Sequence, residues 1–403
     1  MSSDGGAFKT ISFKNVLIIG AVLFASLVSL TDGLNSVALY VAIPAAFLVT
    51  YDRTRKLCLN RYFFIYLLLC FWLFVTSLVA TDVSVAFREL KQVLGAFLLS
   101  YVLSGNVGEE RVKPWLYWAF IILYLMAINY AVSNILVADW DISQDRMDDP
   151  KLNANKLAYY TFYATFALFF LGDLIRKNRV LNRILRILFL LMIPLTFWIA
   201  IMTASRQVLL IQIPTISILG YLRYFSGQRL SKIVVAAAVI VLVAFFASDG
   251  VKDIYEGSYL KERNEKNLEE DSRPKLMANA VRVGLKHPVF GVGPGNFIFY
   301  SYNKHYSHCT YTELFANTGF IGLIIYVVLV IRLLVVNGRR YQKTRDRQYL
   351  VYATFALIFI VYNLFYVFYK DMWLTAFFMI VASDSDSYYY KTDRKKRIQL
   401  NEN

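Results

Sequence analysis

The chain alternates between long apolar blocks and short polar connections. Residues 61–80 (RYFFIYLLLCFWLFVTSLVA) carry a single charge, at their first position, and residues 233–248 and 350–369 are similar. A block of about 18 or more apolar residues is long enough for a helix to cross a bilayer. Such a segment must be helical, because a helix satisfies its own backbone hydrogen bonds where lipid offers none. The pattern predicts an all-α polytopic membrane protein.

About twelve membrane-spanning helices are expected, and we treat residues 1–403 as a single integral membrane domain. The spans are expected near residues 15–31, 34–51, 61–80, 84–104, 114–137, 157–173, 184–203, 206–222, 232–248, 312–331, 350–369 and 371–386. The first block follows a polar start without a clear small-residue cleavage site, so we interpret it as a span and not as a signal peptide.

Composition and charge agree with this class. Hydrophobic residues make up 58% of the chain and charged residues 18%, below the quarter or so that is usual in soluble domains. The net charge of +15 would suggest a nucleic-acid partner in a soluble protein. Here 27 of the 43 Lys and Arg residues fall in connections on the side of the two termini. The positive-inside rule then predicts cytoplasmic termini, membrane lipids as partners and no nucleic acid.

Two connections on the predicted outer side are long. Residues 138–156 end in NANK, and no role is predicted for this loop. Residues 249–311 form the long hydrophilic, extracytoplasmic loop, and connections of this length are usually functional or disordered. Cys58, Cys70 and Cys309 fall in different environments, so neither a disulfide framework nor a metal site is expected.

The long loop contains a helical pattern in RPKLMANAVRVGLKH. Leu276, Ala280 and Val283 recur on one face, and Arg282 lies on another face with Lys275, Asn279 and Lys286. A surface helix lying on the bilayer is the alternative to a functional role. The glycines of the following HPVFGVGPGNF favour a tight turn over a phosphate cradle.

Several cations lie on the predicted outer side, where the positive-inside rule does not explain them. Snorkelling to lipid headgroups would account for each one singly. As a set they favour an anion site, and a lipid-linked diphosphate would suit it because guanidinium and ammonium groups match phosphate oxygens. The candidate ligands are Arg88, Lys91, Arg206, Arg273 and Arg282.

The chain resembles the O-antigen ligase and O-antigen polymerase superfamily. The resemblance rests on TASRQ at a span start, HPVFGVGPGNF in a long loop and SHCTYTELFANTGFIGLIIY entering the next span. NANKLAYY at 153–160 resembles the family's asparagine-rich motif. The family often has Asn after the histidine, whereas Cys309 follows His308 here.

The resemblance implies an inverting, metal-independent glycosyltransferase without a cofactor, in the bacterial cytoplasmic membrane. Its donor would be a glycan on undecaprenyl diphosphate, and its acceptor another lipid-linked glycan or a lipid A–core sugar. A chain-length regulator protein would be a further partner. By resemblance, Arg206 and Arg273 match the family's motif arginines and are assigned to catalysis with His308, whose near-neutral pKa suits a general base.

The sequence pattern also fits other functions. Polymerase is slightly favoured over ligase because SHCTYTELFANTGFIG is nearer to polymerase-type members. A secondary transporter of an organic anion, or a flippase for the lipid-linked glycan, would also fit about twelve spans. Transporters, however, place their ligand groups near the bilayer midplane on broken helices.

Overall fold

The computed structural model describes residues 12–137, 152, 154–175, 178–205, 208–222, 256–257, 261 and 272–401. Every regular element in these ranges is helical, which confirms the all-α class. The elements are α1 (Phe13–Leu27), α2 (Leu34–Val37), the π-helical η1 (Ala38–Ala42), α3 (Ile43–Thr54), α4 (Arg61–Leu78), α5 (Val83–Asn106), α6 (Lys113–Val137), α7 (Ala154–Leu174), α8 (Arg179–Thr203), the π-helical η2 (Val208–Gln212), α9 (Ile213–Gly220), α13 (Ser272–Lys286), the 3₁₀ turn η5 (Asn296–Phe299), α14 (Thr310–Thr344), α15 (Arg347–Tyr362) and α16 (Met372–Asn401).

Six helical segments in the described ranges are long and apolar enough to cross a membrane. They are Leu34–Thr54, Arg61–Leu78, Lys113–Ser133, Asn155–Leu174, Arg179–Thr203 and Thr310–Thr344. Helices α1 and α15 are apolar but shorter. The span expected at 232–248 lies outside the described residues. The chain is therefore a polytopic helical membrane protein, while the count of twelve stays a prediction.

One predicted span is wrong in its second half. Residues 350–369 were expected to form one helix, but α15 ends at Tyr362 and residues 363–371 form a connection to α16. Thr310, at the start of α14, holds this connection: its N–H donates to the Asn363 carbonyl over 2.8 Å and its hydroxyl donates to the Tyr366 carbonyl over 2.7 Å. Backbone groups that a helix would have paired internally are thus satisfied by a neighbouring helix.

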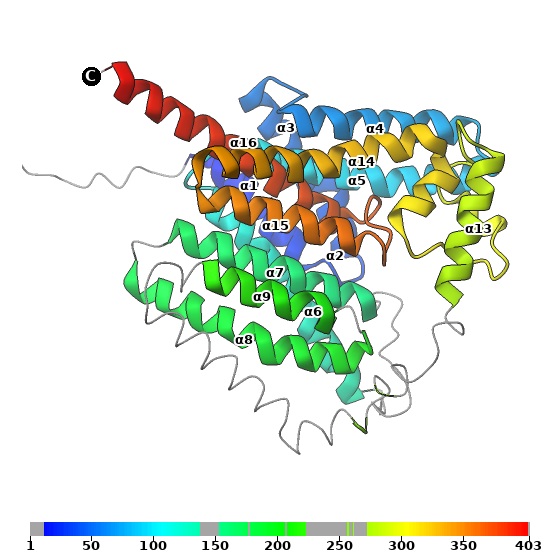
Figure 1. Cartoon of the computed structure of the whole chain (residues 1–403), viewed down its shortest axis with the longest axis horizontal. Helices are drawn as coiled ribbons and strands as arrows, with labels where there is room; N and C mark the ends of the chain where they lie inside the picture. Colours follow the sequence, from blue (N-terminus) through cyan, green and yellow to red (C-terminus); the bar gives the residue numbers. More distant parts are fainter. Residues whose placement is uncertain are drawn as a thin grey trace, which may run out of the picture.

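The long helices lie side by side, as α4, α5 and α14 show in Figure 1, and α13 stands crosswise at one end of them. At this end α5, α7, α14 and α16 begin and α4, α8 and α15 finish. We call it the pocket end. At the opposite end α4, α6 and α15 begin, and the last turns of α16 project away.

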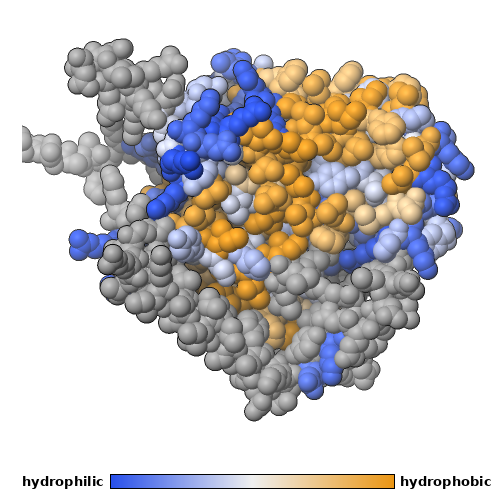
Figure 2. All heavy atoms as spheres, in the orientation of Figure 1, coloured by the Kyte–Doolittle hydropathy of each residue, from blue (hydrophilic) through white to orange (hydrophobic). Residues whose placement is uncertain are grey.

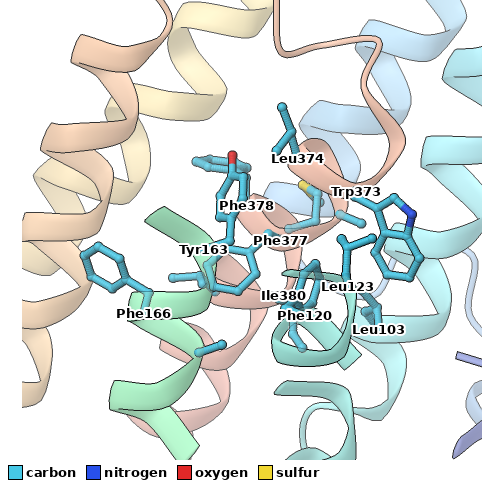
Figure 3. Close-up of a cluster of buried hydrophobic side chains, with 14 of the residues drawn as sticks. Leu103, Phe120, Leu123, Tyr163, Phe166, Trp373, Leu374, Phe377, Phe378 and Ile380 are labelled. Atoms are coloured by element: carbon cyan, nitrogen blue, oxygen red, sulfur yellow. The ribbon is translucent and has the colours of Figure 1, made fainter. Parts of the chain in front are cut away.

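The core between α5, α6, α7 and α16 is largely aromatic (Figure 3). The ring of Phe377 lies 4.6 Å from that of Phe120 and 4.5 Å from that of Tyr163, measured between centroids. Lipid is as apolar as these side chains, so close packing and not the hydrophobic effect holds such helices together. Tilted and edge-on rings provide that packing. The interlocked rings hold α6, α7 and α16 against one another.

The surface divides into bands (Figure 2). Hydrophobic residues cover the middle of the visible face, and hydrophilic residues gather toward both ends of the bundle. Exposed apolar side chains on the helices include Phe71, Ile324 and Val328. An exposed apolar band flanked by polar ends is what a bilayer requires of a spanning bundle.

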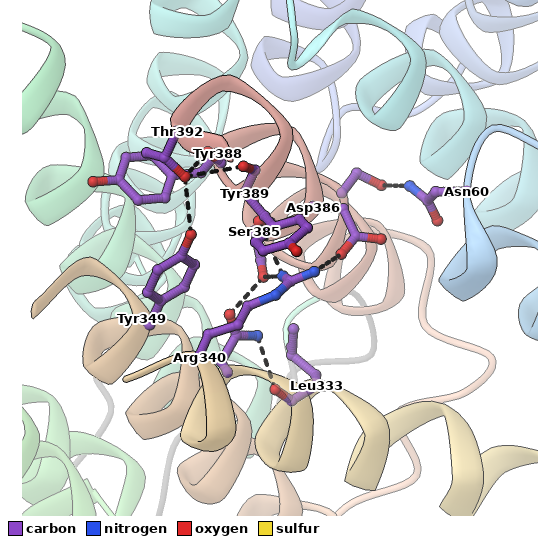
Figure 4. Close-up of polar contacts among 11 residues, drawn as sticks. Asn60, Leu333, Arg340, Tyr349, Ser385, Asp386, Tyr388, Tyr389 and Thr392 are labelled. Carbon is purple, nitrogen blue, oxygen red and sulfur yellow. Dashed lines mark hydrogen bonds and ion pairs between the residues drawn. The ribbon is translucent and has the colours of Figure 1, made fainter. Parts of the chain in front are cut away.

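At the opposite end, a layer of paired polar side chains fastens α16 to its neighbours (Figure 4). Arg340 of α14 donates to Asp386 over 3.0 Å, and Ser385 donates to Asn337 over 2.7 Å. Asp384 accepts hydrogen bonds from Lys113 and Tyr117 of α6. These charges are paired where they are buried, as a low-dielectric environment demands.

Candidate functional site

A pocket of about 730 Å³ lies at the pocket end, between the α2–η1 segment and helices α5, α7 and α16. Four cationic side chains line it: Arg88, Lys91, Lys156 and Lys370. The acidic side chains among its lining residues are Asp32 and Asp371, and aromatic residues including Tyr40, Tyr160, Tyr366 and Trp373 complete the wall. The lining suits an anion that also carries flat or hydroxylated groups.

Two of the cations come from the first turns of α5. The carboxylate of Asp82 begins this helix by accepting the N–H groups of Ser84 and Val85 at 2.9 and 3.2 Å. Arg88 and Lys91 follow at i, i+3 spacing, which puts them on one face. At 1.5 Å per residue, Lys91 lies about 12 Å along the helix from Val83. Its ammonium sits 4.8 Å from the centroid of the Tyr40 ring.

The other two cations are tied to carboxylates through the 363–371 connection. Lys156 pairs with Asp371 over 3.2 Å, and Lys370 pairs with Glu89 over 3.0 Å. Burial disfavours the charged form of Lys370, but Glu89 and Glu313 outweigh it and raise its pKa above the usual lysine value. Lys370 is therefore a firmly charged ammonium at neutral pH.

His308 lies in a tight turn beside this pocket. Its φ is +59°, in the left-handed region that residues other than glycine seldom adopt. The Ser307 N–H donates to the Glu313 carboxylate over 2.7 Å, and the Ser307 hydroxyl donates to the Cys309 carbonyl over 3.0 Å. The imidazole lies against the Tyr306 ring, with 4.2 Å between centroids.

Aromatic side chains connect the His308 turn to the pocket. The Lys370 ammonium lies 5.9 Å from the centroid of the Tyr306 ring, so one cation faces both regions. Tyr366 lines the pocket and packs on Tyr159 at 5.0 Å between centroids. Arg273 of α13 is close enough to Tyr159 for their side chains to interact electrostatically. The pocket, the His308 turn and Arg273 therefore lie close together.

The HPVFGVGPGNF segment, which we call the glycine loop (287–297), is a turn, as expected. Its Val292 and Gly293 N–H groups donate inward, to the carbonyls of Ala316 and Asn317 at 2.9 Å each. At Gly291, where φ is +66°, an added Cβ would lie 2.3 Å from the Asn317 carbonyl carbon. The loop therefore clamps the start of α14, near a break at Gly319, and these N–H groups are not offered to a phosphate.

The glycine loop also touches the charged network. A Cβ on Gly295 would lie 2.5 Å from the Cγ of Glu89, so the loop backbone lies directly against this side chain. The Asn317 side chain accepts the Phe297 N–H over 3.0 Å and donates to Glu313 over 3.1 Å. Both acids that face Lys370 are thus fixed by contacts with the loop.

The structure brings together four of the six site residues predicted from the sequence. Arg88 and Lys91 line the pocket, and Arg273 and His308 lie beside it. Arg282 is exposed on α13, nine residues after Arg273, and this spacing turns it to the opposite face of the helix about 13 Å away. Arg206 lies outside the described residues.

The sequence did not point to five charged residues of this network, which are Glu89, Lys156, Glu313, Lys370 and Asp371. The available signal was the placement of charges in apolar surroundings, such as Lys370 and Asp371 between two predicted spans. A charge within a membrane-spanning region is a functional candidate by default, because it is costly there. In the described ranges, His, Cys, Asp and Glu side chains form no group of three that could hold a metal ion.

Comparison with known proteins adds one match. Residues 187–327 match a family model described as O-antigen ligase. The match covers about a third of the chain and runs from α8 into α14, so it includes the glycine loop, Arg206, Arg273 and His308. No curated protein matches the chain significantly. The family match coincides with most of the segments that carry the resemblance in the sequence, so this part of the chain is similar to the O-antigen ligase family.

Proposed function

We propose that the protein is a glycosyltransferase that transfers a glycan from undecaprenyl diphosphate to a sugar hydroxyl at the outer face of the cytoplasmic membrane. The observation that carries this proposal is a pocket lined by four cations that adjoins the His308 turn at one end of the bundle. The family match supports the same chemistry. Arg88 and Lys91 hold the diphosphate of the donor, together with Arg206 and Arg273.

The reaction needs charge stabilisation more than it needs a strong nucleophile. The acceptor oxygen bonds to the anomeric carbon as the bond from that carbon to the diphosphate oxygen breaks on the opposite face, which inverts the configuration. Negative charge develops on the leaving diphosphate, and fixed cations stabilise it without reorganisation. The acceptor hydroxyl passes its proton to the imidazole of His308, whose ordinary pKa is close to neutral.

Transfer by purified variants with a lipid-linked donor tests the diphosphate site. We expect Lys91→Ala, Arg206→Ala and Arg273→Ala each to reduce transfer about 10²-fold or more, as oxyanion-type donors do when removed. Arg206→Lys should also be impaired, because a point charge does not reproduce the guanidinium fork. Near-native transfer by all three alanine variants, at normal abundance in the membrane, would reject the site.

His308→Ala tests the base. Its transfer should fall by about 10²–10⁴-fold while donor binding is retained. His287 and His305 are both exposed and provide matched controls, so alanine at either should have a small effect. Loss of donor binding in proportion to activity would move His308 into the diphosphate site instead.

Polymerase and ligase differ in the acceptor, and we retain the slight preference for polymerase. The glycan profile of a deletion strain separates them. Attachment of a single repeat unit without extension indicates a polymerase. Accumulation of long, unattached lipid-linked glycan indicates a ligase.

A transporter is the second candidate, and the depth of the charges argues against it. The pocket cations lie in the first turns of α5 and α7 and in the connection before α16. A transporter would place them near the middle of the bundle. Thiol labelling of spheroplasts with an impermeant reagent tests the proposed orientation: Tyr302→Cys, at an exposed position, should react, and the exposed Cys58 of the opposite end should be protected.

A further inference from the structure

His308 occupies a left-handed backbone conformation, with a φ of +59°. Such φ values are uncommon outside glycine, although histidine adopts them more often than most residues do, and they persist where the surroundings over-determine them. No positive φ is seen at Ser307 or Cys309, so the reversal is confined to His308. The contacts of those two neighbours therefore decide which way the imidazole points.

Glu313 provides the contact that fixes this turn. One carboxylate oxygen accepts the Ser307 N–H at 2.7 Å, and the other accepts the Asn317 amide at 3.1 Å. The Ser307 hydroxyl in turn donates to the Cys309 carbonyl and accepts the Thr312 hydroxyl at 3.1 Å. Both sides of His308 are thus attached, directly or through one side chain, to a carboxylate on the first turn of α14.

Glu313 is 1% exposed, and the Lys370 ammonium lies close to it while forming an ion pair with Glu89. A nearby ammonium favours the ionised form of a carboxyl group, which accepts stronger hydrogen bonds than the neutral acid does. The ammonium that lines the pocket therefore also supports the carboxylate that holds the His308 turn.

Both oxygens of Glu313 accept hydrogen bonds from protein donors, and the side chain is 1% exposed. Burial keeps the hydroxyl of an acceptor sugar from reaching the carboxylate, so Glu313 is not assigned as the base. We propose that Glu313 is a positioning residue that holds the Ser307–Cys309 turn, so that the imidazole of His308 stays against Tyr306 at the edge of the cationic pocket. The inference rests on the proposed function and adds to it how the base is oriented.

A double-mutant cycle between Glu313 and His308 tests this role. Glu313→Gln preserves the size of the side chain but removes its charge and one of its two acceptors. His308→Gly removes the imidazole at a position where glycine adopts the backbone conformation without strain. Glu110→Gln is the control, because Glu110 is an exposed acid paired with Lys391 at the opposite end.

Glu313→Gln should reduce kcat by about 10²-fold, the effect of displacing a catalytic group by about 1 Å. The KM for the donor should stay unchanged, since the cations of the pocket remain. In the His308→Gly background, Glu313→Gln should cause no further loss, because the group that it positions is gone. Glu110→Gln should match the native protein.

Losses that multiply in the double variant would overturn the inference, and so would native kcat in Glu313→Gln. Full activity of His308→Gly would instead reject His308 as the base, which is a failure of the proposed function. If Glu313→Gln does not fold, Ser307→Ala replaces it in the cycle. That variant keeps the buried Glu313 contacts and removes the hydroxyl of Ser307, with its hydrogen bonds to Cys309 and Thr312, and it should show the same loss in kcat alone.

Discussion

Replacing Gly291 by alanine tests whether the glycine loop clamps the start of α14. The new Cβ would lie 2.3 Å from the carbonyl carbon of Asn317 and 2.4 Å from the nitrogen of Thr318. Both are backbone atoms of a packed helix, so neither gives way as the end of a flexible side chain would. At a φ of +66°, alanine also adopts a left-handed conformation that costs about 1–2 kcal/mol.

The two costs add. Overpacking in a close-packed interior costs about 1–3 kcal/mol, so Gly291→Ala should destabilise the protein by about 2–5 kcal/mol in total. Relief of the clash would move the loop away from Asn317, whose amide holds Glu313. Transfer activity should therefore fall along with stability.

The assay is the melting temperature of the purified protein in detergent, with transfer activity measured in parallel. Gly20 and Gly338 are the matched controls, because a Cβ at either meets no atom within 4 Å. Both lie within helices, where alanine is favoured over glycine by up to about 1 kcal/mol. A melting temperature for Gly291→Ala as high as those of the two controls would refute the clamp.

Three further outcomes are expected. Asp384→Asn should lower the melting temperature by the equivalent of about 3–5 kcal/mol, because it leaves Lys113 buried without its carboxylate. Lys370→Met should lower it as well. Because the pKa of Lys370 is raised, its contribution to stability is complete below the ordinary lysine pKa of about 10.4 and is lost as the pH rises through the higher folded value. The difference in melting temperature between the variant and the native protein should therefore be constant near neutral pH and narrow only in strong alkali. Arg282→Ala should retain far more transfer activity than Arg273→Ala, since the two side chains leave opposite faces of α13; equal losses in the transfer assay would contradict this placement.

The helical architecture could be predicted from hydropathy, but the 363–371 connection could not. Its residues, NLFYVFYKD, are apolar almost throughout, so their composition is that of a spanning helix. What makes them a connection is Thr310, more than fifty positions earlier in the chain, which supplies their hydrogen-bond partners. The local pattern of hydrophobic residues cannot indicate a contact with a residue so far away in the chain.

The candidate site could also be predicted only in part, because local spacing determines some of its contacts and the packing of distant segments determines the others. Arg88 and Lys91 could be placed together because i, i+3 spacing on a helix fixes their relation. The relation of Lys370 to Glu89 depends on how α5 packs against the start of α16, and no spacing expresses it. The periodicity of α13 correctly gave its buried face, at Leu276, Ala280 and Val283, but could not show which exposed face looks toward the pocket.

The polar layer at the opposite end has a consequence for biogenesis. Alone in hydrocarbon, α16 would expose Asp384 and Asp386, and each aspartate costs about 2.5–3.5 kcal/mol at the centre of an inserting helix, less toward its ends. Their partners Lys113 and Arg340 belong to α6 and α14, which are synthesised first. Lateral release of α16 from the insertion machinery should therefore depend on α6 and α14, which are synthesised earlier and can pair with its aspartates.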